Sequence, residues 1–335
     1  MSNEQSSGAQ VGLTAAEISN IWAAYMKSCM EQRFFEYFIK TTENPDVKKI
    51  VENMLNHALS SLGELKEIFV KEKLSVPVGF TESDVNSEAP KAFSDTFILF
   101  FCQDITMLSM TTYPCAFSDC SRADIRDFFK KGLEFFMAVQ NEVVGLMLSQ
   151  GVYLRAPQVA VDNGVDFVDS KKYLIGLFGG SRPVNTSEIA NLTRIMHRAQ
   201  FSKMIFVSFA KLTTDKELSK HFSKGRDVVQ SVLDSFLEVL QNENIPMSSS
   251  SDYKTFDVDA QPISDKLMLF FVNMCLGIFC FTMISQAKTS SFRSDIVMKA
   301  SKIMKDMEFY YAEGLKLMIE REWLEQPPQA VDRRL

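Results

Sequence analysis

The chain contains the same stretch of sequence twice, and this duplication restricts the folds open to it more than any other feature. Residues 153–162 read YLRAPQVAVD and residues 323–332 read WLEQPPQAVD, so an aromatic residue, a leucine, a proline and Ala-Val-Asp recur 170 positions apart. Two further matches keep the same order at spacings of 170 and 171, namely Phe93-Ser94-Asp95 with Ile263-Ser264-Asp265 and Glu17-Ile18 with Glu188-Ile189. Matches in one order across both halves predict two copies of one structural unit.

Each copy shows the pattern of four helices. Between residues 14 and 42, apolar residues recur three or four positions apart, which is the spacing of one helix face. Thr14, with Glu17 three residues later, predicts a capping box, and Asn44-Pro45 predicts the end of this helix. The other helices are expected at about 45–73, 94–118 and 121–150 in the first copy and at about 185–212, 215–243, 263–288 and 291–322 in the second.

A long connection separates the second and third helices of each copy, at residues 74–93 and 244–262. Because the other connections within a copy are short, helices two and three must run parallel, and the long connection must return along the bundle. One such crossover is typical of ferritin-like bundles. The sequence therefore predicts an all-α protein of two tandem ferritin-like four-helix bundles, at 12–162 and 185–335, joined by a linker at 163–184.

Charge and hydropathy exclude some classes of protein. A formal net charge of -6 argues against general binding of nucleic acid, which requires a basic surface. Residues 267–287 carry no charge and are about long enough to span a bilayer. The matching segment 97–117, however, has Asp104 in its middle, where a charge would be costly in lipid. We therefore expect a buried bundle helix and no membrane span.

The cysteines and the N-terminus indicate the compartment. None of the six cysteines forms a Cys-x-x-Cys pair, which leaves zinc and thioredoxin chemistry without support. Residues 1–10 are polar and lack the basic start and apolar stretch of a signal peptide. These features predict a cytoplasmic protein with reduced thiols.

The duplicated motifs resemble those of a known family. The segments PVGFTESDVN (77–86) and WLEQPPQAVDR (323–333), together with the repeat, are similar to an uncharacterised family, a domain of unknown function, of spore-forming Bacillus-type bacteria. The resemblance covers about residues 12–335. It implies a tandem ferritin-like protein, distantly similar to spore-coat F-type proteins, and it implies no reaction.

The histidines decide whether a two-metal centre is to be expected. Such a centre in a ferritin-like bundle needs inward carboxylates from all four helices and Glu-x-x-His on two of them. The chain has three histidines, His57, His197 and His221, and none lies three residues after a glutamate. A competent two-metal oxidase and a resident cofactor are therefore not expected.

Four polar residues of the first copy lie on apolar helix faces, namely Gln32, His57, Asp104 and Gln140. At ~1.5 Å per residue, all four fall about 15 Å from one end of the bundle. We predict one buried polar layer that holds the helices in register through mutual hydrogen bonds. A relic or single-ion site for a divalent metal, using His57 and Asp104, stays open as an alternative. The matching residues of the second copy cannot bind a cation in this way, and these are Lys203, Val228, Met274 and Tyr310.

Three functions follow from these features. The sequence favours a non-enzymatic structural or interaction protein, cytoplasmic or spore-associated, that self-associates or binds a protein partner, because duplication fixes a pseudo-dimer. The content of 18 Met and 28 Phe leaves open a carrier of an apolar small molecule or lipid in a Met- and Phe-rich cleft. The third function is a metal-binding redox protein with a degenerate site in the first bundle. No enzymatic reaction can be assigned from the sequence.

Overall fold

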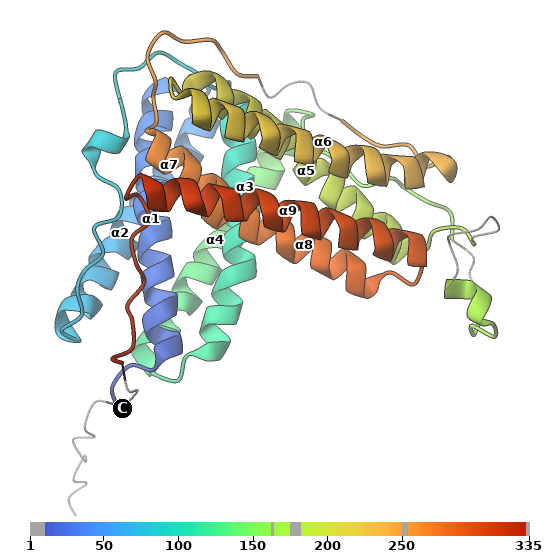
Figure 1. Cartoon of the computed structure of the whole chain (residues 1–335), viewed down its shortest axis with the longest axis horizontal. Helices are drawn as coiled ribbons and strands as arrows, with labels where there is room; N and C mark the ends of the chain where they lie inside the picture. Colours follow the sequence, from blue (N-terminus) through green and yellow to red (C-terminus); the bar gives the residue numbers. More distant parts are fainter. Residues whose placement is uncertain (1–10, 162–163, 175–181, 250–253, 333–335) are drawn as a thin grey trace, which may run out of the picture.

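The computed structural model describes residues 11–161, 164–174, 182–249 and 254–332, and in this part of the chain the regular structure is helical. The first half contains α1 (Ala15–Thr41), α2 (Pro45–Lys71), α3 (Asp95–Asp119) and α4 (Ala123–Ser149). The second half contains α5 (Thr186–Leu212), α6 (Lys216–Asn242), α7 (Asp265–Phe270), α8 (Gly277–Ser290) and α9 (Ser294–Glu320). The helices of one half run across those of the other (Figure 1). The predicted all-α architecture, with two tandem halves and a long crossover in each, is confirmed.

Capping side chains determine where the helices begin. Thr14 accepts a hydrogen bond from the Glu17 N–H, and the Glu17 carboxylate accepts one from the Thr14 N–H, as the predicted capping box requires. Asn44 caps α2, which has proline at its first position. In the second half, Asn185 and Glu188 form the same capping box at α5. The two copies therefore begin their helices at equivalent residues for the same physical reason.

The third helix of the second half contains one extra residue. It consists of α7, the π-helical segment Phe271–Leu276 and α8, and it continues without interruption from Asp265 to Ser290. Its N-cap Ser264 matches Ser94 at an offset of 170, whereas its C-cap Ser291 matches Cys120 at an offset of 171. A π-helical turn widens the helix enough to hold one added residue, so the two ends keep their places.

Two crossovers pair with each other across the halves. Isolated antiparallel bridges join Val85 to Ile263 and Phe93 to Thr255. At the offset of 170 that relates the two copies, Thr255 is the counterpart of Val85, and Ile263 is the counterpart of Phe93. Each bridge is therefore the counterpart of the other, which is the reciprocal contact expected at a two-fold axis.

Aromatic packing marks the same axis. Phe101 and Phe271 are equivalent residues of the two copies, and their rings stack with centroids 5.1 Å apart. Both are buried, and Phe34 packs against each of them. The two halves thus share one continuous apolar core around a pseudo-two-fold axis.

The repeated tail motifs hold the halves together. The Glu325 carboxylate accepts hydrogen bonds from the N–H groups of Val78 and Gly79, at 3.0 and 2.9 Å. At the equivalent place in the first tail, the carbonyl of Arg155 accepts a hydrogen bond from the Ser248 hydroxyl at 2.9 Å. Each tail therefore lies on the crossover of the other half, and in Figure 1 the C-terminal segment runs back past α1.

A buried carboxylate closes one end of each bundle. Glu17 Oε1 accepts hydrogen bonds from the N–H groups of Ser121 and Arg122, both at 2.8 Å. Arg122 in turn pairs with Glu72 at 2.8 Å. Glu188, Arg293 and Glu243 repeat this arrangement in the second half. We call each of these groups an end cluster.

Among the described residues, the helix Asp265–Ser290 has the length and composition to cross a membrane. Of its most apolar window, 72% is buried inside the protein. Packing between the helices therefore accounts for most of its apolar surface. The predicted linker is described only in part, because residues 175–181 lie outside the described ranges.

Candidate functional site

The structure brings two of the four predicted polar residues into one pocket. Asp104 and Gln140 line a cavity of about 290 Å³ between the halves. Gln32 instead donates a hydrogen bond to Glu36 on its own helix, at 2.8 Å. The ring of His57 stacks on Phe135, with centroids 3.8 Å apart.

His57 is a neutral, partly buried residue of the first bundle. Its Nε2 lies 3.4 Å from the Ser61 hydroxyl. Burial, with the nearby Lys27 ammonium, lowers the pKa of His57 to about 4. The carboxylate that could have favoured the charged imidazolium, Asp104, pairs with Arg198 of α5. Asp104 lies on α3 and Arg198 lies on α5 of the other half, so their pairing depends on how the two bundles cross. The helix pattern within one copy gives no information on this crossing.

We call the cavity between the halves the junction pocket. Its floor comes from α3 and α4, one wall comes from α5, and Tyr153, Leu154 and Ala156 of the first tail cover it. The polar residues that line it are Gln103, Asp104, Gln140, Thr193, Arg194, His197 and Arg198. This pocket therefore brings polar side chains of both halves together in one cavity.

The Asp104–Arg198 ion pair is buried, with relative exposures of 6% and 7%. The Arg198 guanidinium also lies over the ring of Phe279, 4.2 Å from its centroid. Asp104 Oδ2 finds no hydrogen-bond partner among the residues that the structure describes, although a buried carboxylate oxygen normally requires one. The pair is therefore neutral as a unit, and it leaves Asp104 Oδ2 as an acceptor and Arg198 Nε and Nη1 as donors without hydrogen-bond partners among the described residues.

Arg194 is a partly buried cation held by neutral groups. Its Nη2 donates to the side-chain oxygens of Asn191 and Gln286, at 2.6 and 2.9 Å. Its Nε is buried, and no described residue accepts a hydrogen bond from it. Burial lowers the pKa of Arg194 below its ordinary value. No ion pair is found for Arg194 among the described residues, so its charge is compensated only by amide dipoles.

His197 anchors the cover of the pocket. Its Nε2 lies 2.8 Å from the Ser248 hydroxyl, which donates to the carbonyl of Arg155 in the first tail. Because that hydroxyl proton is engaged, Nε2 of His197 must carry the proton that Ser248 accepts. Burial lowers the pKa of His197 to about 4, so the ring is neutral near pH 7. The chain His197–Ser248–Arg155 ties the tail over the pocket.

The pseudo-two-fold axis relates the junction pocket to a second cavity of about 130 Å³, which we call the mate pocket. At the positions of Thr193, Arg194, His197 and Asp104, the mate pocket has Trp22, Ala23, Met26 and Met274. The two pockets occupy equivalent places in the fold but differ in chemistry. Polar groups were therefore not required there by the packing of the halves.

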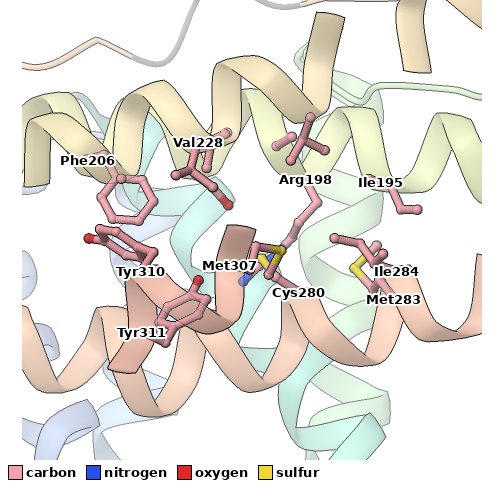
Figure 2. A pocket seen from close by; sticks show the side chains of 15 residues that line it. Ile195, Arg198, Phe206, Val228, Cys280, Met283, Ile284, Met307, Tyr310 and Tyr311 are labelled. Carbon is pink, nitrogen blue, oxygen red and sulfur yellow. The ribbon is translucent and has the colours of Figure 1, made fainter. Parts of the chain in front are cut away.

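The bundle centres are filled differently. In the first bundle, the Lys27 ammonium bonds Glu31 at 2.5 Å and lies over the ring of Phe136. In the second, a cavity of about 30 Å³ lies between α5, α6, α8 and α9, and Tyr310 packs edge-on against Phe206 (Figure 2). About 30 Å³ is the share of one water, far below the ~300 Å³ of a small-molecule pocket. Arg198 lines both this cavity and the junction pocket.

Within the described residues, no group of three or more His, Cys, Asp or Glu side chains is placed to hold a metal ion. The residues that sequence reasoning missed are Arg194, His197 and Arg198. A position-by-position comparison of the two copies could have found them, because Arg194 and Ala23 are equivalent residues of opposite character.

Comparison with known proteins gives a family and a distant structure. A solved structure from Bacillus halodurans C-125, described as a "putative spore coat protein", is 15% identical, with a TM-score of 0.40, over 45% of this chain and 98% of its own. A comparison with curated proteins finds no match. The family model "Protein of unknown function (DUF3231)" matches residues 2–165 and again residues 173–335. The chain therefore belongs to the DUF3231 family and carries its domain twice.

Proposed function

We propose that the chain is a non-enzymatic interaction protein, associated with the spore, in which two ferritin-like bundles form a fused dimer around one ligand-binding pocket. The observation that carries this proposal is the contrast between the two equivalent pockets. The junction pocket has two arginines, a histidine and an aspartate, whereas the mate pocket has apolar residues at three of those positions and Lys27 at the fourth. Buried polar groups are costly, and the four charged or polar side chains of the junction pocket correspond to a single charged one in the mate pocket, which indicates use.

The bundle centres support a binding role over catalysis. In the first bundle, a lysine ammonium already compensates Glu31, so that carboxylate has its counter-ion. In the second, the buried Tyr310 stacks on His221, with ring centroids 4.4 Å apart. The junction pocket, in contrast, directs charged and polar groups of both halves, Arg194 and Asp104 among them, into a cavity between the bundles.

The fused dimer gives the pocket its shape. Its walls come from α3 of one half and α5 of the other, and the first tail covers it. The reciprocal bridges Val85–Ile263 and Phe93–Thr255 keep the halves in register. The pocket therefore exists only where both halves are held together, which gives a reason for joining them in one chain.

Association with the spore rests on the resemblance of residues 77–86 and 323–333 to a family of spore-forming bacteria. It is tested by immunodetection of the full chain in purified spores and in the mother-cell cytosol of the organism that encodes it. We expect the chain in the spore fraction. Detection in the cytosol alone would remove this part of the proposal.

The role of the pocket is tested by filling it. The triple substitution Thr193→Trp, Arg194→Ala, His197→Met places the mate-pocket residues in the junction pocket. Since Trp22, Ala23 and Met26 occupy equivalent places, we expect the variant to fold, as checked by circular dichroism and thermal unfolding. We expect less of the folded variant than of the native chain in spores. Equal amounts would show that the pocket is not where the protein interacts.

A further inference from the structure

We propose that the junction pocket binds one small carboxylate, a hydroxy acid or amino acid, through Arg194. This inference rests on the proposed function, because it assigns the chemical class of ligand to the same pocket. It follows from which groups in the pocket lack a partner, from their charges, and from the space around them.

Arg194 supplies the site for the carboxylate. A guanidinium donates five N–H bonds in a fork that matches two carboxylate oxygens. In this chain, the bonds found for Arg194 come from Nη2 and reach two neutral amide oxygens. Its Nε is buried and finds no acceptor in the described ranges of the chain. Since the described residues provide no carboxylate for this partly buried arginine, the carboxylate of a ligand is the partner that suits it best.

Asp104 and Thr193 require a second group on the ligand. Both line the pocket, with relative exposures of 6% and 1%, and within the described part of the chain Asp104 Oδ2 and Thr193 Oγ1 find no hydrogen-bond partner. A carboxylate oxygen can only accept a hydrogen bond, so its partner must be a donor. A hydroxyl or ammonium group next to the ligand's carboxylate supplies that donor.

The charge of the pocket is suited to one carboxylate group. Arg198 and Asp104 compensate each other, His197 is neutral near pH 7, and Arg194 remains as one positive charge. One carboxylate balances this charge, whereas a dianionic phosphate would leave a surplus beside Asp104. The pocket is therefore better suited to a carboxylate than to phosphate.

The space and walls limit the rest of the ligand. A volume of about 290 Å³ is close to the lower limit of small-molecule pockets. Phe100 and Phe201 supply aromatic walls, and Leu154 of the tail adds an aliphatic one. The ligand therefore carries a compact apolar group in addition to its polar end. In the mate pocket, Ala23 and Met274 replace Arg194 and Asp104, so one ligand binds per chain.

Isothermal titration calorimetry on the full chain tests this inference. The probes are L-leucine, L-phenylalanine, 3-phenyllactate, leucinamide, which lacks the carboxylate, and inorganic phosphate. We expect at least one of the first three to bind with one site per chain, and leucinamide and phosphate to bind about tenfold or more weakly. No binding by any of the three carboxylates, tighter binding of phosphate, or two sites per chain would overturn the inference.

Variants locate the binding. Arg194→Ala should weaken the carboxylate about tenfold or more, and Arg194→Lys should recover only part of the loss because it lacks the fork. Arg226→Ala, at a surface arginine whose side chain is 42% exposed, removes the same charge elsewhere and should leave binding unchanged. Binding that survives Arg194→Ala would overturn the inference.

The filled-pocket variant separates the two proposals. If phosphate or leucinamide binds best and the triple variant abolishes this binding, the carboxylate inference fails while the pocket remains a binding site. If the triple variant binds the carboxylate as the native chain does, or reaches spores equally well, the proposed function fails.

Discussion

Lys27 and Arg198 occupy equivalent positions in the two copies, but they pair with carboxylates at different places in the fold. Lys27 bonds Glu31 inside its own bundle, whereas Arg198 crosses to Asp104 of the other half. The second copy has Ser202 at the position equivalent to Glu31. It has Met274 at the position equivalent to Asp104. Each cation is thus accompanied by its own carboxylate, and the choice of partner decides whether the charge lies in the bundle or at the junction.

The first prediction concerns this junction pair. Asp104→Met should destabilise the protein by about 3–5 kcal/mol, because it leaves the buried Arg198 charge without compensation. The double variant Asp104→Met, Arg198→Met should cost less than the single one, since neither charge is then buried. Urea unfolding of these two variants and of the single variant Arg198→Met measures the difference. A double variant as unstable as the sum of the singles would contradict this account.

The second prediction concerns pH. Burial alone would raise the pKa of Glu17, but hydrogen bonds from Thr14, Arg122 and Ser121 outweigh it and lower the pKa to about 2. The stability that Glu17 contributes is therefore present above pH 4.5 and is lost as the pH falls toward 2. Glu17→Gln should flatten the stability curve in this range. Denaturant unfolding between pH 2 and pH 7 provides the comparison.

At neutral pH the same variant should be less stable by about 1–2 kcal/mol, because an amide nitrogen cannot accept the hydrogen bond from the Thr14 N–H. Glu320→Gln, at an exposed residue at the end of α9, is the matched control. It should alter neither the stability nor its pH dependence. If the stability of Glu17→Gln fell below pH 4.5 as steeply as that of the native chain, other carboxylates would control acid unfolding.

The third prediction concerns the extra residue of the second half. Deletion of Met274 should convert the π-helical segment into regular α-helix and leave both capped ends in place, with little loss of helicity. Deletion of Gln103 from α3, which has no residue to spare, should turn the following part of the helix by about 100° and unfold the first half. Circular dichroism and thermal unfolding of the two deletions distinguish these outcomes. Equal damage would mean that the π-helical segment is required in its own right.

The fourth prediction concerns two helical glycines. A Cβ at Gly314 would lie 2.3 Å from Asn273 Oδ1, so Gly314→Ala should destabilise by about 1–3 kcal/mol. A Cβ at Gly63 would meet nothing within 4 Å, so Gly63→Ala should stabilise by up to about 1 kcal/mol through its helix propensity. Thermal unfolding measures both. A neutral Gly314→Ala would show that the π-helical segment yields easily.

The fifth prediction concerns the tails. Glu325→Gln replaces one carboxylate oxygen by an amide nitrogen, so one of the bonds from Val78 and Gly79 is lost. We expect a loss of about 1–2 kcal/mol. We also expect faster proteolysis of the C-terminal segment, which limited digestion followed by mass spectrometry detects. Digestion at an unchanged rate would indicate that Trp323 and Leu324 hold the tail without Glu325.

The fold could be predicted because its signals are local or repeated. Thr14 with Glu17 and Asn44 with Pro45 mark helix ends within a few residues, and the recurrence of the tail motif reveals the copies. The pairing of Asp104 could not be predicted in this way. Its partner belongs to the other half, and the crossing of the bundles depends on the whole interface. The offset between the copies changes from 170 at Ser94 to 171 at Cys120. This change indicates that the third helix of the second copy is one residue longer, which is the π-helical insertion.

The reciprocal contacts have a consequence for synthesis. The backbone of the first crossover pairs with residues near 254–263. The N–H groups of Val78 and Gly79 bond Glu325, which is translated almost 250 residues later. At roughly 5–20 residues per second, the ribosome needs on the order of 10–50 s to produce that partner. For this interval the first half exposes unpaired backbone and the apolar face that Phe271 later covers. The order of translation therefore sets a period in which this backbone and apolar surface are exposed, and the period ends only when Glu325 has been made.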